Sequence, residues 1–271
     1  MINKIKISLL QIQSKDTPFE NSLMIKNILN KIIKFNPHIV CLPECSNIMT
    51  GNRIHLFKNV TYEENCPVLD ECKKFSKKNK ISISIGSLLL RKKNSKKLLN
   101  RSFFIDNNGK IISYYDKIHL FDVNINKKEI HRESSSFNKG TKIVYANSSF
   151  GKIGLSICYD IRFPNLFAKL TKMGVKIILV PAAFTRPTGK DHWEVLLRSR
   201  AIENTCFIIA SAQCGKHHGG RKTYGHSMIV NPWGKIIIKG NSEPAILNAT
   251  INMNDIKKIR QKMPSIKHSN L

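Results

Sequence analysis

The chain has 271 residues, 41% of them hydrophobic, and its 45 Lys and Arg against 18 Asp and Glu give a formal net charge of +27. This composition excludes an intrinsically disordered chain, and seven cysteines at this length exclude a small disulfide scaffold. No apolar run approaches the roughly 18 to 20 residues that span a bilayer, and the N-terminus lacks a signal-peptide core. We therefore expect a cytoplasmic protein with free thiols and no membrane partner.

The first half of the chain alternates short apolar strands with amphipathic helices. The expected elements, in order, are a strand at Ile5–Leu10, a helix at Ser22–Phe35, a strand at His38–Leu42, a helix at Val68–Lys78, and strands at Ile81–Leu90, Arg101–Asp106 and Lys110–Tyr114. Asn107-Asn108-Gly109 predicts a hairpin turn between the last two strands. The stretch from Asp122 to Gly140 is expected to be a long loop, and loops of that length are often functional.

The second half of the chain shows the same alternation of strands and helices. The expected strands are Lys142–Tyr145, Lys152–Ile157, Ile177–Val180, Phe207–Ala212, His226–Val230, Lys235–Ile238 and Ala245–Ile251, and the expected helices are Pro164–Met173, Trp193–Asn204 and Asp255–Lys262. Two similar halves with apolar sheet faces would pack sheet against sheet and leave their helices outside. We assign residues 1–254 to one domain and residues 255–271 to a C-terminal helix and polar tail.

The net charge admits two interpretations. Lys and Arg release counterions from phosphate backbones, so the charge alone would fit a protein that binds nucleic acid. The lysines are spread along the whole chain, however, with abundant Asn and Ile, and these three residue types share AT-rich codons. Paired lysines such as Lys73-Lys74 also lack interleaved aromatic residues that could stack on bases. We favour a composition bias and do not expect a nucleic-acid partner.

Three residues that could take part in catalysis lie at strand ends or in apolar surroundings. Cys158 follows an apolar strand six residues before Pro164, at a turn where backbone N–H groups can stabilise a thiolate or an oxyanion. Glu44 directly follows a buried strand, where α/β folds place ligands. Lys117 lies among aromatic and aliphatic residues. Taken singly, each also fits a structural role: a buried cysteine, a surface glutamate and one lysine among many.

A resemblance joins these three positions. The segments Pro43–Glu44, Asp116–Asp122 and Ile157–Pro164 resemble the three signature blocks of the nitrilase superfamily of carbon–nitrogen hydrolases, in the family's order and over about Ile7 to Asn254. The resemblance implies a four-layer αββα sandwich, with two similar halves, and a Glu-Lys-Cys catalytic triad. It also implies a homodimer that forms through the helices after Cys158 and His192.

The residue types fit the chemistry that this resemblance implies. Glu44 would take the Cys158 proton, because a thiol is mostly protonated at neutral pH, and the thiolate would attack an amide carbonyl to form a thioester. Lys117 and the backbone N–H of Tyr159 would hold the oxyanion. Glu133 resembles a second family glutamate that positions the lysine or the substrate, although an exposed loop glutamate is the alternative. The reaction needs no cofactor or metal, and we expect neither.

Further segments narrow the family. Those at Ala183–Glu194, Ala212–His218, Tyr224–Met228 and Pro232–Gly234 look most like the deaminated-glutathione amidase branch. Members of that branch hydrolyse deaminated glutathione to 2-oxoglutarate and cysteinylglycine, which implies a small anionic amide as substrate. An ω-amidase that acts on 2-oxoglutaramate is the alternative within the family.

Cationic loop residues would bind such a substrate. The candidates are Arg186, His192, His217 and Arg221, and the arginines suit carboxylates because a guanidinium can form two parallel hydrogen bonds. In so basic a protein, solvated surface charge is an equally good interpretation. Cys214, His217 and His218 could also suggest a metal site, but the pattern lacks a paired second half, and we do not expect one.

Overall fold

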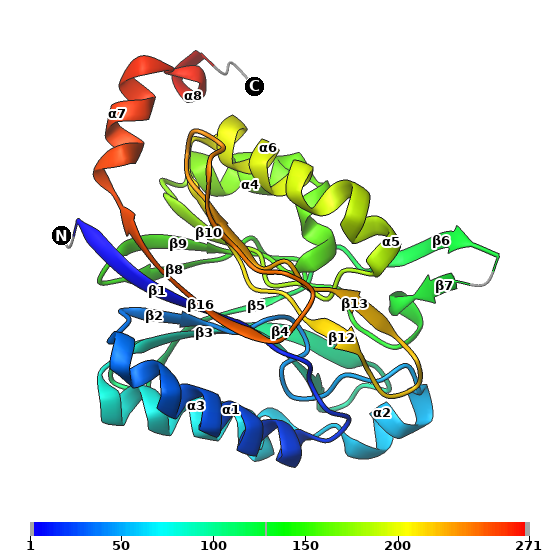
Figure 1. The fold of residues 1–271 in the computed structure, drawn as a ribbon. Coiled ribbons are helices and arrows are strands. Elements are labelled where there is room, and N and C mark those ends of the chain that lie inside the picture. Colours follow the sequence, from blue (N-terminus) through cyan, green and yellow to red (C-terminus); the bar gives the residue numbers. More distant parts are fainter. Residues whose placement is uncertain (1–2, 128, 269–271) are drawn as a thin grey trace.

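The computed structural model describes residues 3–127 and 129–268 and contains two six-stranded sheets (Figure 1). The first sheet has the strand order β16-β1-β2-β3-β4-β5. Its strands are β1 (Lys4–Gln11), β2 (Ile39–Cys41), β3 (Ser82–Arg91), β4 (Leu98–Ile105), β5 (Ile111–Asp116) and β16 (Ala245–Asn252). The strands β1, β2 and β3 run parallel to one another, and the remaining pairs are antiparallel.

The second sheet has the order β15-β14-β11-β10-β9-β8. Its strands are β8 (Tyr145–Ser148), β9 (Gly151–Leu155), β10 (Ile177–Leu179), β11 (Phe207–Ala210), β14 (Met228–Val230) and β15 (Ile236–Lys239). Here β9, β10 and β11 are parallel. Each half of the chain therefore contributes one sheet, except that β16 leaves the second half and pairs with β1 along eight residues.

Helices cover the outer face of each sheet (Figure 1). The first sheet carries α1 (Pro18–Ile32) and α3 (Pro67–Asn79), and the second carries α4 (Pro164–Lys172) and α6 (Glu194–Asn204). The α1 helix begins where the Thr17 side chain accepts a hydrogen bond from the Glu20 N–H, and it buries Ile25, Leu29 and Ile32 toward the sheet. This arrangement confirms the expected four-layer αββα sandwich.

Two apolar layers hold the sandwich together. The larger one joins the inner faces of both sheets, with Ile7 and Phe104 from the first sheet and Ile153 and Ile208 from the second, and it continues under α4 and α6. A separate layer lies between the first sheet and its helices. Because both faces of the central strands are buried, these strands are continuous apolar runs, and this made them easy to predict from the sequence.

The structure corrects several boundaries. The stretch from Asp122 to Gly140 is not an uninterrupted loop, since it contains the hairpin of β6 (Asp122–Asn126) and β7 (Glu129–Arg132). The strand expected at Lys142–Tyr145 begins only at Tyr145. Short elements without a clear periodic pattern were also missed: α2 (Arg53–Asn59), α5 (Arg186–Thr188), β12 (Cys214–Lys216) and β13 (Lys222–Tyr224).

The C-terminal segment leaves β16 and forms α7 (Asn254–Lys262) and α8 (Ser265–His268), so the expected helix is present and part of the expected polar tail is helical. Ile256 is buried, and the Arg260 Nε donates to the Thr205 hydroxyl 3.1 Å away. Residues 269–271 of the expected tail lie outside the described residues. Among the residues that are described, no helix has the length and apolarity to cross a membrane.

Candidate active site

Cys158 lies at a sharp turn directly after β9. Its backbone has φ +50°, in the left-handed region that a side chain with a Cβ rarely adopts. Two contacts hold the turn: the Cys158 N–H donates to the Pro181 carbonyl at 2.8 Å, and the Ile157 N–H donates to the buried Asp160 carboxylate at 2.8 Å. The local strain and the bonds that enforce it fix the direction of the thiol.

Asp160 also joins this turn to the first sheet. Its carboxylate accepts the Tyr115 hydroxyl at 2.8 Å and the His119 backbone N–H at 3.1 Å. Tyr115 is the penultimate residue of β5, and His119 follows it in the next loop. The segment that carries Lys117 is therefore bonded to the segment that carries Cys158.

Glu44 follows β2 at the carboxyl end of a central parallel strand and is 3% exposed. Its two carboxylate oxygens have different partners. One accepts the Ala183 backbone N–H at 2.9 Å, and the other accepts the Lys117 Nζ at 2.9 Å and the Asn100 amide at 2.9 Å. The Cys158 thiol lies close enough to this carboxylate for the charge of Glu44 to raise the thiol pKa. Glu44 is thus bonded to Lys117 and lies beside Cys158.

Lys117 follows β5 and is buried between two carboxylates. Besides Glu44, its Nζ donates to both Glu133 oxygens, at 2.9 and 3.1 Å. Glu133 is held in turn by the Phe121 N–H at 2.6 Å and the Asn100 amide at 3.1 Å. The structure therefore brings together Glu44, Lys117, Glu133 and Cys158 from four distant parts of the sequence.

The charges of this cluster follow from its geometry. Burial opposes ionisation of Glu44, but the Lys117 ammonium outweighs it and lowers the pKa of Glu44 below its ordinary value. Burial would likewise lower the pKa of Lys117, but Glu133 and then Glu44 raise it well above 10.5. For Cys158, burial and the negative charge of Glu44 both raise the thiol pKa well above 9.0. The cluster rests as a carboxylate, an ammonium and a neutral thiol.

A cavity of about 900 Å³ opens above this cluster. Glu44, Lys117, Glu133, Cys158 and Tyr159 are among the residues that line it. The walls also carry further cations, namely Arg53, Arg132, Arg186, Arg221 and Lys222. The lining holds three acidic residues, Glu44, Glu129 and Glu133, against these five cations and Lys117, so positive charge is in excess. The cavity therefore favours an anionic ligand.

The predicted substrate-binding residues differ in position. Arg221 is half-buried in the cavity wall, donates one Nη to the Ala183 carbonyl at 3.2 Å and leaves a buried Nε without a partner. Its charge also helps to lower the pKa of Glu44, which places it close to the cluster. Arg186 lines the cavity but is exposed at its rim.

The two histidines lie outside the cavity lining. His192 is exposed, and its Nδ1 lies 3.1 Å from an Arg162 Nη. His217 is buried, with Nδ1 3.1 Å from the Ser14 carbonyl and Nε2 2.8 Å from the Thr223 hydroxyl. Burial lowers the pKa of His217 to about 4, so it is a neutral side chain that holds the β12–β13 hairpin to the body of the protein.

Sequence reasoning missed two contributors. Asn100, on β4, donates to both Glu44 and Glu133, and Ala183 supplies the N–H that fixes the second Glu44 oxygen. Asn100 stands in an otherwise apolar strand, and this break in the pattern was the only signal available. The Ala183 contact is made by the backbone and leaves no trace in the sequence.

Comparison with known proteins agrees with this geometry. The sequence model of the carbon-nitrogen hydrolase family matches residues 6–261. Deaminated glutathione amidase of Dictyostelium discoideum is 38% identical over 100% of this chain and 96% of its own, and the Yersinia enterocolitica protein of the same name is 36% identical over 97% and 92%. The solved structure of the C. elegans NitFhit protein has a TM-score of 0.91 at 32% identity, covering 99% of this chain and 65% of the longer worm chain.

Proposed function

The chain belongs to the carbon–nitrogen hydrolase family, and we propose that it hydrolyses the amide bond of deaminated glutathione to 2-oxoglutarate and cysteinylglycine through a Cys158 thioester. The observation that carries this proposal is the buried Glu44–Lys117–Cys158 cluster at the floor of a cation-lined cavity. The names of relatives at 38% and 36% identity support the choice of substrate.

The first half of the reaction uses the resting charges of the cluster. Glu44, a carboxylate in contact with a neutral thiol, takes the Cys158 proton as the sulfur attacks the amide carbon. The carbonyl oxygen gains the negative charge, and the Lys117 ammonium and the Tyr159 N–H stabilise it. Glu44 then returns the proton to the nitrogen, the carbon–nitrogen bond breaks, and cysteinylglycine leaves as the free amine.

In the second half of the reaction, water takes the place of the thiol as the nucleophile. Glu44 removes a proton from water, whose oxygen attacks the thioester carbon, and the sulfur leaves and recovers the proton as a thiol. Glu133 and Asn100 act as positioning residues here, because they are bonded to Lys117 and Glu44 and take no proton or bond in either half-reaction. Their bonds keep the ammonium fixed through both half-reactions, so no reorganisation is needed when the oxyanion forms.

The cavity supports an anionic substrate with two charged ends. Deaminated glutathione has one carboxylate beside its keto group and a second on its glycine. Arg221 lies near Glu44 and has a buried Nε free to donate, whereas Arg186 stands at the rim. Arginines in the wall and at the rim suit a ligand with two carboxylates, one on each side of the scissile amide, with Arg221 near one of them.

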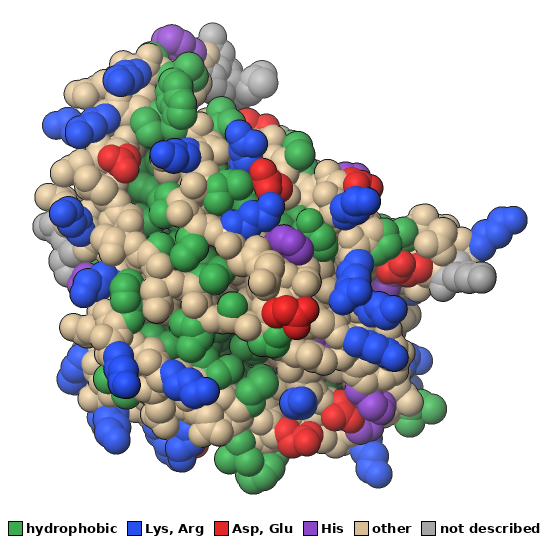
Figure 2. All heavy atoms as spheres, in the orientation of Figure 1, with side chains coloured by type: hydrophobic (Ala, Val, Ile, Leu, Met, Phe, Trp, Pro, Cys, Tyr) green, Lys and Arg blue, Asp and Glu red, His purple; other side chains and the backbone are tan. Residues whose placement is uncertain are grey.

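A direct comparison of substrates tests this choice. We expect kcat/KM on deaminated glutathione to exceed that on 2-oxoglutaramate, because the smaller molecule lacks the cysteinylglycine part and its carboxylate. Higher kcat/KM on 2-oxoglutaramate would assign the protein as an ω-amidase instead. Absence of hydrolysis of either amide, combined with salt-dependent binding to random DNA, would favour the nucleic-acid alternative. On the face shown in Figure 2, however, Lys and Arg are scattered and form no single stripe.

We also propose a cytoplasmic homodimer. Large apolar side chains are exposed on and beside α6, including Val195 (63%) and Trp233 (55%), and they would be covered by a second copy. All seven cysteines are free and buried, which suits a reducing compartment. Light scattering of the full chain should give twice the monomer mass of 30.9 kDa, and the monomer mass would contradict this assembly.

A further inference from the structure

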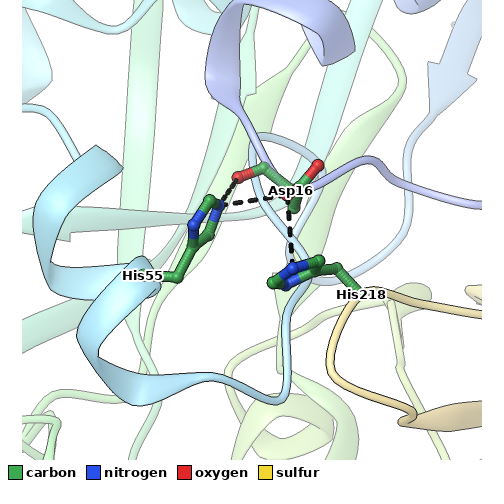
Figure 3. A group of neighbouring side chains, drawn as sticks. All are labelled: Asp16, His55 and His218. Atoms are coloured by element: carbon green, nitrogen blue, oxygen red, sulfur yellow. Dashed lines mark hydrogen bonds and ion pairs between the residues drawn. The ribbon is translucent and has the colours of Figure 1, made fainter.

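A second cluster, of side chains that can bind a metal ion, lies beside the cavity and includes none of Glu44, Lys117 and Cys158. Asp16 precedes α1, His55 lies in the first turn of α2, and His218 lies at the tip of the β12–β13 hairpin (Figure 3). One carboxylate oxygen and one ring nitrogen from each histidine all lie within 4.8 Å of one another. Among residues 3–127 and 129–268, this is the only group of three such side chains.

The distances match those of a coordination shell. The Asp16 Oδ2 lies 3.1 Å from the His55 Nε2 and 3.8 Å from the His218 Nε2. The His55 Nε2 also lies 2.9 Å from the Asp16 carbonyl oxygen, a contact that an ion bound to this nitrogen would replace. Ligand atoms bound tetrahedrally to zinc at about 2.0 to 2.2 Å are roughly 3.4 Å apart, so an ion fits among these three atoms with small rotations of the side chains. The carboxylate points between the two rings, as Figure 3 shows.

Surrounding contacts orient the ligands before any ion arrives. The Thr50 hydroxyl lies 2.8 Å from the His218 Nδ1, which fixes the ring and leaves its Nε2 toward Asp16. The His218 carbonyl accepts the Gly51 N–H at 2.8 Å, so the hairpin tip is bonded to the segment before α2. The N-terminal turn of α2 is capped by Asn52, which accepts the His55 N–H at 3.0 Å.

The side chains are also open to solvent. Asp16, His55 and His218 are 30%, 26% and 45% exposed, so an ion can enter and keep water on its remaining positions. Two imidazoles and one carboxylate form a donor set that suits zinc and similar transition metals, whereas Mg²⁺ and Ca²⁺ prefer oxygen ligands.

We propose that Asp16, His55 and His218 form a binding site for one divalent transition-metal ion of the zinc type, held by three protein ligands and water. This inference departs from our sequence expectation, which weighed His218 together with Cys214 and His217 and expected no metal site. Both of those are buried, and neither belongs to the cluster.

The bound ion would tie two segments of the cavity wall to the segment that precedes α1. Gly51, Gly219 and Gly220 line the cavity, and Arg221 follows His218 by three residues on the same hairpin. Metal binding therefore stabilises the hairpin in the position that the structure shows, at a distance from Glu44, Lys117 and Cys158. The ion acts as a structural clamp and takes no part in amide hydrolysis.

Metal titration of the full chain tests the site. We expect one Zn²⁺ per chain by calorimetry and by elemental analysis after dialysis, and a higher Tm in its presence. His55→Gln and His218→Gln should each weaken binding at least tenfold and abolish the rise in Tm. Thr50→Val, which removes the contact with the His218 ring together with the hydroxyl's bond from the Asn52 N–H, should weaken binding about tenfold. The matched control is His268→Gln, an exposed histidine on α8, which should bind as the unaltered chain does.

Cobalt distinguishes this site from binding at cysteine. Co²⁺ held by nitrogen and oxygen gives ligand-field bands without thiolate charge-transfer absorption, and Cys158→Ala should leave its spectrum unchanged. The proposal is overturned if the chain binds no Zn²⁺ or Co²⁺, if both histidine variants bind as well as the unaltered chain, or if a thiolate band disappears in Cys158→Ala.

Discussion

The floor and the rim of the cavity differ in burial and in how firmly their side chains are held. At the floor, Glu44, Lys117 and Cys158 are 3%, 2% and 7% exposed, and each is bonded to residues of other segments. At the rim, Arg186 and Lys222 are exposed on short elements that follow no strong sequence pattern. In the proposed mechanism the floor breaks the amide bond, and the rim and walls select the substrate.

The difference has energetic consequences. Removing one partner of a buried ion pair leaves an uncompensated charge, which typically costs about 3 to 5 kcal/mol. An exposed charge at the rim is screened by water and salt, so its removal leaves the fold intact. Substitutions at the floor should thus reduce catalysis on every substrate and often stability as well, whereas substitutions in the wall or rim should act on selected substrates.

The largest effect is expected at the nucleophile. Cys158→Ala should abolish turnover and thioester formation on any amide, because it removes the sulfur that forms the proposed covalent intermediate. Cys214→Ala, at a buried cysteine outside the cavity lining, should keep most of the activity. Rapid-mixing mass spectrometry of the acyl-enzyme, together with steady-state rates, measures both variants. Equal losses from both would remove Cys158 from its proposed role.

Lys117→Met should have the next largest effect. It removes an oxyanion donor and leaves Glu44 and Glu133 facing each other without a cation, so the chemical step should slow by about 10² or more. Single-turnover rates measure that step, and circular dichroism verifies the fold. Lys139→Met, at an exposed lysine, is the matched control and should behave as the unaltered chain. Near-normal single-turnover rates in Lys117→Met would contradict the assignment.

The sequence predicted the floor far better than the walls. Apolar strand runs placed Glu44 and Cys158 at strand ends, and the family resemblance supplied their connection to Lys117. Asn100 was not predicted, since its role depends on β4 lying beside β3 and β5, and such neighbours are set by long-range pairing. The fold class was predictable for a related reason: buried strands have a local pattern that survives without knowledge of their partners.

Wall residues are harder to predict because their positions depend on loops. His192 and His217 are close in sequence to cavity residues but lie outside the lining, the first beside Arg162 and the second under the β12–β13 hairpin. Asp16 and His55 gave no signal at all, since 39 and 202 positions separate Asp16 from its two partners in the cluster of Figure 3. Nothing local in the sequence indicates that these segments meet.

Substituting Arg221 distinguishes a residue that binds substrate from one that supports the catalytic cluster. Its half-buried guanidinium, with a free Nε near Glu44, should contribute a charge-assisted contact to a substrate carboxylate. Arg221→Ala should lower kcat/KM on deaminated glutathione by about 10- to 150-fold, the effect of losing one such contact. Hydrolysis of a neutral amide of similar size should change little. Equal losses on both amides would show that Arg221 supports the floor through Glu44 and does not bind the substrate carboxylate.

Arg186 should show the smallest effect, although the sequence gave it the same weight as Arg221. It is exposed at the rim, where water and salt screen its charge, so Arg186→Ala should lower kcat/KM on deaminated glutathione by no more than roughly fivefold. Because the interaction is screened, the difference between this variant and the unaltered chain should shrink further as ionic strength rises. Steady-state kinetics at low and high salt measure both effects. A tenfold or larger loss that persists at high salt would mean that Arg186 turns inward and binds the carboxylate directly, as a wall residue does.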